Sequence, residues 1–556
     1  MKNKSLIHSF VLLFCIAVFS FLLRITGLFW DGGFHLHPDE RAILLFTLPI
    51  SFPSSFIEFL SPSSNLNPHF FAYGSFPLYL LKGVSIPASF FNNSIGTYEN
   101  MHILGRVISA LFDTGTIVML FFLTRKIFTN KIGLIASLLY GISVLPIQLS
   151  HFYAVDTILT FFITTLIYVL ILFYEKPTIL KSIIIGILFG TALATKISAI
   201  VILFSIGLTL TTDIILEILR KGRNLYPLIR RLIFFLLIIS ITTVAMFFIL
   251  EPYAYLDFAN FYKQNQTQYN MTHNAFIFPY TLQYVGKIPY LFELKNIFFW
   301  GLGPIMSLIS LFGFLLLLFH IGKERKIDSR AKEIIIVTFF ILYFGIVGSF
   351  AIGFMRYLLP IYPFLAIFGA YGLSFIKSRM PFAFWAVILV LLLIWPASFF
   401  SIYNNTHPRV VASLWIHSKI AEGSTIAVEH WDDSLPLYGQ EKYNVETLAL
   451  YEPDSKEKWE KINKQLQKSE YIILSSNRLY IPLQKLTDCK KLPSIYCYPQ
   501  TAQYYKNLFS GKLGFKNVAE FTNYPTIPIL GIKINDLHAD ESFTVYDHPK
   551  VIIFKK

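Results

Sequence analysis

Charged residues are scarce in this chain, and cysteine is scarcer still. Asp, Glu, Lys and Arg make up 14% of the 556 residues, whereas a soluble domain usually has about 25%. This shortage argues against an ordinary soluble protein. The three cysteines, Cys15, Cys489 and Cys497, form neither a CxxC motif nor a Cys/His spacing typical of metal sites. The cysteines therefore give no indication of a Cys-based metal centre.

Long apolar runs take the place of the missing charges. Hydrophobic residues make up 54% of the chain, and a helix needs about 20 apolar residues to cross a bilayer. Eleven ranges meet that requirement closely enough to be predicted as membrane spans: 6–29, 101–123, 132–150, 157–174, 182–195, 197–216, 232–250, 297–320, 334–352, 357–376 and 382–401. The first range lacks a small-x-small cleavage site, so we expect a retained span rather than a signal peptide. Segment 76–91 is shorter and contains Pro77 and Pro87, and we expect an interfacial or re-entrant segment there.

The basic residues indicate how the chain lies in the membrane. Nineteen Lys and Arg residues gather at one set of span ends, and few lie at the other. By the positive-inside rule the N-terminus is cytoplasmic. An odd number of spans then places everything after about residue 402 outside. The same clustering accounts for the net charge of +14 without a nucleic-acid partner.

The composition changes after residue 402. We predict a transmembrane domain over 1–402, with long outer loops at 30–100 and 251–296, and an extracytoplasmic soluble α/β domain over 403–556. Trp459–Lys468 has the pattern of a polar helix, while 471–475 and 551–554 have that of strands. Cys489 and Cys497 would lie in a compartment that permits disulfides, either bridged or as two free thiols.

The first outer loop carries an acidic pair, Asp39 and Glu40. A carboxylate just outside a span is suited to act as a general base toward an acceptor hydroxyl. Two alternatives remain open from the residues alone. Asp39 could cap a helix that begins near Glu40, or it could join His35 and His37 in binding a metal.

Other ionisable residues lie at predicted span ends, where charge is costly and often functional. Asp156 precedes an apolar run, either as a helix cap or as part of a site. Lys196 interrupts an apolar stretch and could pair with a lipid phosphate or with Asp156. Arg356 could hold a phosphate in its guanidinium fork or extend toward the interface. Arg106 is a weaker candidate of the same kind.

Several segments, in this order and on these membrane sides, carry a family resemblance. They are HPDE at 37–40, NPHFFAYGSFPLYLL at 67–81, HFYAVDTILTFF at 151–162, ALATKISA at 192–199, PYTLQYVGKIPY at 279–290 with WGLGP at 300–304, RYLLPIYPFLAI at 356–367 and EHWDDSLPLY at 429–438. The chain resembles bacterial membrane glycosyltransferases of the dolichyl-phosphate-mannose protein mannosyltransferase type. These are family-39-like members of the GT-C superfamily, related to the lipid A aminoarabinose transferase.

The resemblance implies an enzyme: an all-α polytopic GT-C bundle that moves a hexose or pentose from a polyprenyl-phosphate donor to a lipid, glycan or protein acceptor, with inversion. It assigns the base role to Asp39 in the pair with Glu40, and a further acidic role to Asp156. Lys196, Arg356 and Arg106 are the candidates for binding the donor phosphate. The expected substrate-lining residues are His37, His69, Tyr73, Glu251 and Tyr290. No cofactor is expected, although the sequence leaves a divalent metal open.

Two other functional classes compete with this interpretation. A transporter would also place charges within a helical bundle, but it predicts internal repeats and charges near the midplane. Neither is evident in the sequence. An envelope receptor would use the outer domain as its binding module, and deletion of 404–556 would then abolish all function.

Overall fold

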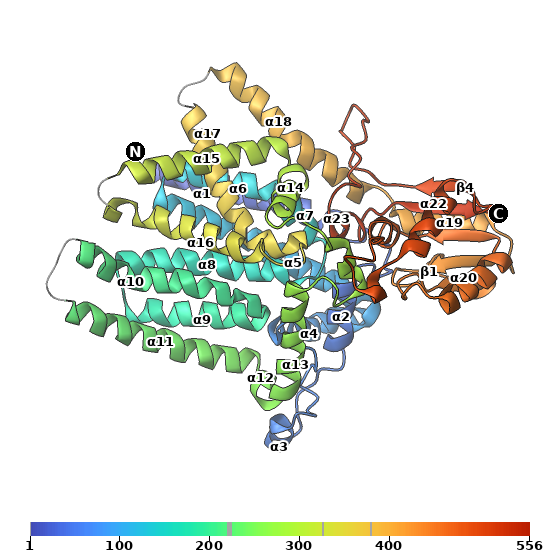
Figure 1. Cartoon of the computed structure of the whole chain (residues 1–556). Helices are drawn as coiled ribbons and strands as arrows, with labels where there is room; N and C mark the ends of the chain where they lie inside the picture. Colours follow the sequence, from blue (N-terminus) through green and yellow to red (C-terminus); the bar gives the residue numbers. More distant parts are fainter. Residues whose placement is uncertain (1, 220–224, 325–326, 378–380) are drawn as a thin grey trace.

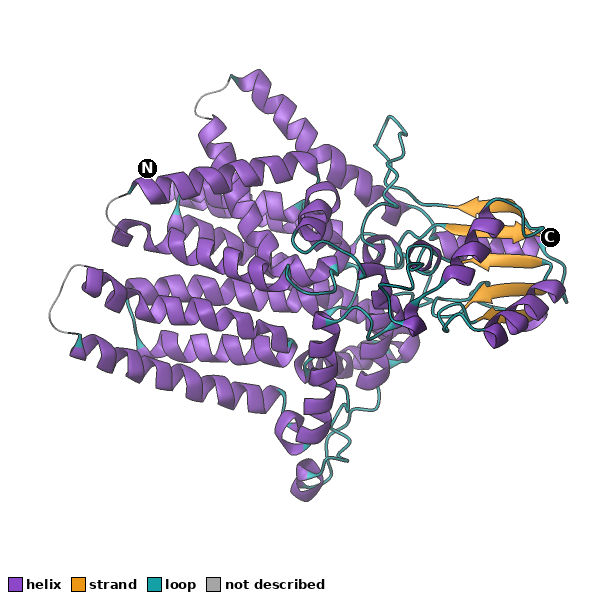
Figure 2. Cartoon of the chain, in the orientation of Figure 1, coloured by secondary structure: helices purple, strands orange, loops and turns teal. Residues whose placement is uncertain are grey.

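The computed structural model describes residues 2–219, 225–324, 327–377 and 381–556. Helices make up most of it, and strands occur at one end (Figure 2). Six of the basic residues behind the predicted orientation lie outside the described residues: Arg220, Lys221, Arg223, Arg325, Lys326 and Arg379.

Each of the eleven predicted spans coincides with a helix or with a pair of helical segments that follow each other (Figure 1). Because lipid offers no hydrogen bonds, apolar runs satisfy their backbone groups internally as helices. These helices are α1 (Lys2–Ile25), α5 (Tyr98–Ile127), α6 (Asn130–Gly141) with α7 (Val144–Ser150), α8 (Val155–Glu175), α9 (Ile179–Thr195), η2 (Ile197–Ile202) with α10 (Leu203–Leu219), α11 (Tyr226–Leu250), η4 (Ile297–Gly301) with α15 (Pro304–Lys323), α16 (Ala331–Val347), η6 (Met355–Ile361) with α17 (Tyr362–Lys377), and α18 (Phe382–Phe400).

The predicted helical membrane bundle is thereby confirmed. Within the described residues, seven helices are long and apolar enough to cross a membrane, and α6 with α7, bent by 58°, would make an eighth. The apolar helices over 179–195 and 197–212 are shorter. The count of eleven spans therefore stays a prediction.

The two long loops also contain helices. The first holds α2 (Pro38–Thr47), α3 (Phe56–Leu60), α4 (Ser75–Phe91) and η1 (Asn93–Gly96); the second holds α12 (Tyr253–Leu256), α13 (Phe258–His273), η3 (Pro279–Tyr284) and α14 (Leu291–Asn296). Segment 76–91 lies within one helix, α4, despite its two prolines. Pro77 falls in the first turn, where no intrahelical N–H bond is lost. Whether α4 lies at the interface stays a prediction.

The C-terminal region folds around a five-stranded sheet of order β2-β1-β3-β5-β4. Its strands are β1 (Thr425–Glu429), β2 (Asn444–Leu448), β3 (Tyr471–Leu474), β4 (Lys516–Phe521) and β5 (Val551–Lys555). Both neighbours of β1 run parallel to it, and β5 is antiparallel to β3 and β4. Its helices are α19 (Pro408–Lys419), α20 (Lys456–Lys468), α21 (Tyr480–Leu483), α22 (Pro499–Phe509) and α23 (Glu541–Thr544). The small α/β domain is confirmed, and Cys489 and Cys497 form a disulfide.

The C-terminal region is joined to the bundle by residues that return to the helix ends. Phe543 belongs to the main hydrophobic core of the bundle. The Gln148 amide donates to the Phe543 carbonyl at 2.7 Å and to the Asp547 carboxylate at 3.1 Å. The N-terminus and the sheet lie at opposite ends of the bundle (Figure 1). This junction frames the candidate site, and the boundary at 402/403 stays a prediction.

Candidate active site

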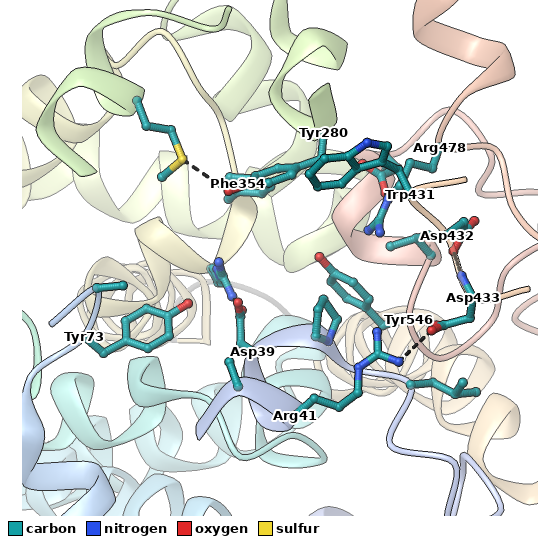
Figure 3. A pocket seen from close by; sticks show the side chains of 18 of the residues that line it. Asp39, Arg41, Tyr73, Tyr280, Phe354, Trp431, Asp432, Asp433, Arg478 and Tyr546 are labelled. Carbon is teal, nitrogen blue, oxygen red and sulfur yellow. Dashed lines mark hydrogen bonds and ion pairs between the residues drawn. The ribbon is translucent and has the colours of Figure 1, made fainter. Parts of the chain in front are cut away.

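A cavity of about 460 Å³ lies between the helix ends and the sheet domain (Figure 3). Its walls come from α2, the loop before α4, α13, η3, η6, α19, the loops after β1 and β3, and the segment around α23. Lining side chains include Asp39, Arg41, Tyr73, Tyr280, Arg356, Tyr357, Arg409, Trp431, Asp432, Asp433, Arg478, Glu541 and Tyr546. A concave site that combines aromatic and ionisable groups is the usual setting for a ligand.

Asp39 enters the cavity from the first turn of α2. The helix begins after His37, whose Nδ1 accepts the Glu40 N–H at 3.4 Å, and Pro38 occupies the first helical position. The Asp39 carboxylate forms an ion pair with the Arg356 guanidinium of η6. Arg356 also lies 5.3 Å from the Phe354 ring and 5.7 Å from the Tyr357 ring. The structure therefore brings together two residues that the sequence proposed for different roles.

Asp156 and Lys196 form a second ion pair beside the cavity. Lys196 Nζ lies 2.8 Å from the Asp156 carboxylate, where α9 ends and α8 begins. The same ammonium lies 4.3 Å from the centre of the Tyr357 ring and 5.9 Å from that of Tyr73. Both rings line the cavity. Lys196 thus lies next to the cavity wall rather than in it.

Glu40 and Arg106 lie away from the cavity in a fully buried network. Arg106 donates to Glu40 at 2.7 and 2.9 Å and to Asp31 at 2.7 Å. Glu40 also accepts the Tyr153 N–H at 2.9 Å. Consecutive helical residues point about 100° apart, so Asp39 faces the cavity while Glu40 faces the bundle. Glu40 and Arg106 thereby fix α2 against α5 and against the turn before α8.

Of the five predicted substrate-lining residues, Tyr73 lines the cavity and the other four do not. His37 is buried beside it, between Phe152 and Tyr546. Burial, helped by the charge of Arg356, holds the pKa of His37 well below its usual value.

The other three predicted lining residues lie elsewhere. His69 is half-exposed, 3.7 Å from Asp257. Glu251 accepts a hydrogen bond from the Ser75 hydroxyl at 2.9 Å, and burial raises its pKa to about 8. Tyr290 donates to the Gly345 carbonyl at 3.1 Å. Among the described residues, no cluster of three or more His, Cys, Asp or Glu side chains is placed to hold a metal ion.

The cavity also contains charged side chains that were not among the predicted site residues. Arg409 bonds Asp432 at 2.6 Å and Asp433 at 2.7 Å, and Arg41 bonds Asp433 at 2.6 Å. Arg478, from the loop after β3, bonds Glu541 at 2.7 Å. The resemblance of the segment 429–438 was the signal for Asp432 and Asp433. The arginines gave no local signal, because their partners are distant in sequence.

One comparison with known proteins bears on the family. Residues 99–246 match the family model described as Dolichyl-phosphate-mannose-protein mannosyltransferase. The matched range includes the segments at 151–162 and 192–199, so the match confirms the predicted resemblance. Asp156 and Lys196 lie inside this range and Asp39 and Arg356 outside it. No curated protein sequence matches the chain.

Solved structures give weaker likenesses. The archaeal oligosaccharyltransferase AglB from Archaeoglobus fulgidus, in complex with an inhibitory peptide and a dolichol-phosphate, is 12% identical with a TM-score of 0.49, covering 99% of this chain and 88% of its own. ArnT from Cupriavidus metallidurans, bound to undecaprenyl phosphate, is 11% identical with a TM-score of 0.43. The match covers 98% of this chain and 97% of the ArnT chain. The S. cerevisiae protein O-mannosyltransferase Pmt1-Pmt2 complex, bound to the sugar donor, is 16% identical with a TM-score of 0.34. The match covers 46% of this chain and 34% of the matched yeast chain. At such TM-scores these likenesses carry no conclusion about this chain.

Proposed function

We propose that this chain is a membrane glycosyltransferase of the GT-C type that transfers a sugar from a polyprenyl-phosphate donor to an extracytoplasmic acceptor. The observation that carries the proposal is the Asp39–Arg356 pair in a cavity between the membrane bundle and the sheet domain. The description of the matching family model names a dolichyl-phosphate sugar. A donor of that chemistry has a lipid tail and an anionic phosphate, and the cavity lies at the ends of the bundle helices and is lined by arginines that suit an anion.

The proposed orientation puts the cavity on the extracytoplasmic side of the plasma (inner) membrane. Lys and Arg gather at the span ends that include the N-terminus. The sheet domain lies at the other end of the bundle (Figure 1). Under the positive-inside rule the basic end is cytoplasmic, so the cavity and the sheet domain face outward.

In the proposed reaction, Asp39 is the general base. Its carboxylate accepts the proton of an acceptor hydroxyl, and the hydroxyl oxygen attacks the anomeric carbon. The bond between that carbon and the phosphate oxygen breaks, and its electron pair leaves with the polyprenyl phosphate. Because attack and departure take place on opposite faces, the anomeric configuration inverts. The phosphate departs as an anion at neutral pH, so the reaction needs no separate acid.

Arg356 and Lys196 are proposed to hold the phosphate. Negative charge grows on the leaving phosphate in the transition state, and fixed cations stabilise it there. A guanidinium has five N–H donors, so Arg356 has the capacity to bind a phosphate oxygen while it keeps Asp39 in place. Lys196 reaches the same region beside the Tyr357 ring, and Asp156 orients it. The mechanism uses only side chains of this chain.

The test is a transfer assay with the purified protein in lipid nanodiscs. Each of a panel of polyprenyl-phosphate sugars is supplied with mixed acceptors, with and without EDTA, and products are identified by mass spectrometry. We expect one donor class to be consumed, with a glycosylated product of inverted configuration, whether or not EDTA is present. Uptake of a solute into sealed vesicles without any donor turnover would instead identify a transporter.

A further inference from the structure

The cavity has an aromatic wall on the side of the sheet domain. Trp431 lies in the loop after β1, and Tyr280 of η3 lies beside it with the ring centres 6.5 Å apart. Both side chains lie along one side of the cavity (Figure 3). Although it belongs to a folded domain, the Trp431 side chain is 49% exposed. A large aromatic face left open toward a cavity is a feature that ligand sites use.

The backbone at Trp431 is held in a conformation that bulky residues rarely adopt. Its φ is +68°, and strain of this kind persists where the surroundings enforce it, often at functional sites. The enforcing contacts are to the next two residues. The fully buried Arg409 binds the carboxylates of both Asp432 and Asp433, and the Ser476 hydroxyl donates to Asp432. These contacts hold the backbone that carries Trp431 in place before any ligand arrives.

The charges that line the cavity are balanced. Four arginines (Arg41, Arg356, Arg409 and Arg478) stand with four carboxylates (Asp39, Asp432, Asp433 and Glu541). A strongly acidic or basic acceptor would meet as much repulsion as attraction there. A neutral ligand rich in hydroxyl groups fits better, because each hydroxyl both donates to carboxylates and accepts from guanidinium groups.

The two ends of the cavity differ in what can reach them. Tyr73, in the loop before α4, and Tyr357, in η6, lie next to Lys196 at the bundle end of the cavity, where a lipid-linked donor has to enter. Trp431 and Arg478 come from the sheet domain and lie on the other side of Asp39 from Tyr73 (Figure 3). An acceptor that arrives from water would therefore meet the aromatic wall first, with Asp39 between it and the donor.

We infer that Trp431 and Tyr280, with the flanking Asp432, Asp433 and Arg478, form an acceptor subsite for a neutral carbohydrate. A sugar ring stacks its C–H face on the indole, since the negative face of an aromatic ring attracts weakly positive C–H groups. The hydroxyls at its edge bond to the carboxylates and guanidinium groups. The acceptor is thus a glycan rather than a peptide. This inference rests on the proposed function for its reaction, but its binding chemistry can be tested separately.

The first experiment measures binding without any donor. Neutral manno-, gluco- and galacto-oligosaccharides are titrated into the full-length protein in nanodiscs, with binding followed by saturation-transfer NMR. We expect at least one series to bind, the Trp431→Ala variant to weaken its Kd by about tenfold or more, and Trp431→Phe to restore most of the affinity. Tyr438→Ala is the matched control: Tyr438 belongs to the same domain and is 43% exposed, but it does not line the cavity. It should bind as the wild type does.

The second experiment separates the acceptor role from the donor role. With a donor present, Trp431→Ala should raise the KM for the oligosaccharide while slow donor hydrolysis and donor Kd stay unchanged. A change in donor Kd would assign the aromatic wall to the donor and overturn the inference. Binding of a Ser/Thr peptide, but of no oligosaccharide, would overturn it too. If no donor is consumed but oligosaccharides bind through Trp431, the proposed reaction fails and the subsite stands.

Discussion

Asp39 and Arg356 form an ion pair although α2, near the start of the chain, and η6, in its second half, lie far apart in sequence. The pair joins the first outer loop to the short helical segment before α17. It places a carboxylate and a guanidinium side by side on a cavity wall. This is the combination that a transfer from a phosphate ester to a hydroxyl requires.

The affinity for the donor phosphate should depend on Arg356 and Lys196. Arg356→Gln or Lys196→Gln would remove one charged hydrogen bond, which contributes about 1.5–3 kcal/mol. We therefore expect donor affinity to fall roughly ten- to a hundredfold in each variant. The measurement is the Kd of a polyprenyl-phosphate sugar by microscale thermophoresis in nanodiscs. Lys295→Gln removes an exposed charge outside the cavity and should leave the Kd unchanged. Unchanged affinity in both cavity variants would remove the phosphate role from them.

The sequence reveals the candidate site only in part. Asp39, Arg356, Asp156 and Lys196 stand out because charge at the end of an apolar run is costly. The direction in which each side chain points is not a local property. Glu40 follows Asp39 directly, and yet it turns into the bundle toward Arg106.

Arg106 should matter for stability rather than for donor binding. Its guanidinium is fully buried between Glu40 and Asp31, and removal of one member of such a group costs about 3–5 kcal/mol because the others stay charged and unpaired. Arg106→Met should therefore lower the unfolding temperature and the folded yield, as measured by fluorescence-detected gel filtration after heating. The folded fraction should bind donor with normal affinity. A stable Arg106→Met variant that had lost donor affinity would instead place Arg106 at the phosphate.

Most of the fold was accessible from the sequence. Runs of about 20 apolar residues have to form helices in lipid, and the strands at 471–475 and 551–554 were evident from their composition. The return of Phe543 and Asp547 to the bundle was not, because it depends on contacts with α7 and η7 (Ser401–Asn404). Contacts between distant segments leave no periodic pattern.

His548 should make stability depend on pH. Burial alone would lower its pKa, but the carboxylates of Asp547 and Asp536 outweigh burial and raise it to about 10. A raised histidine pKa contributes stability that is fully present below the unfolded value of about 6.5. This contribution is lost as the pH rises from there through about 10. Thermal melts of the wild type should show this decline.

The control for His548 uses two variants. His548→Gln should melt lower at pH 6 and lose the decline between pH 6.5 and 10. The exposed His273→Gln should keep the wild-type profile. A His548→Gln profile parallel to that of the wild type would show that His548 is neutral in the folded protein.

The most direct test of the account is the rate of sugar transfer by Asp39→Asn. The amide keeps the size of the carboxylate but cannot accept the proton, so kcat should fall by about 10²–10⁴-fold. Donor Kd and unfolding temperature should stay close to those of the wild type, and Glu58→Gln, outside the cavity, should transfer normally. Wild-type transfer by Asp39→Asn would contradict the assignment of the cavity as the site of the reaction.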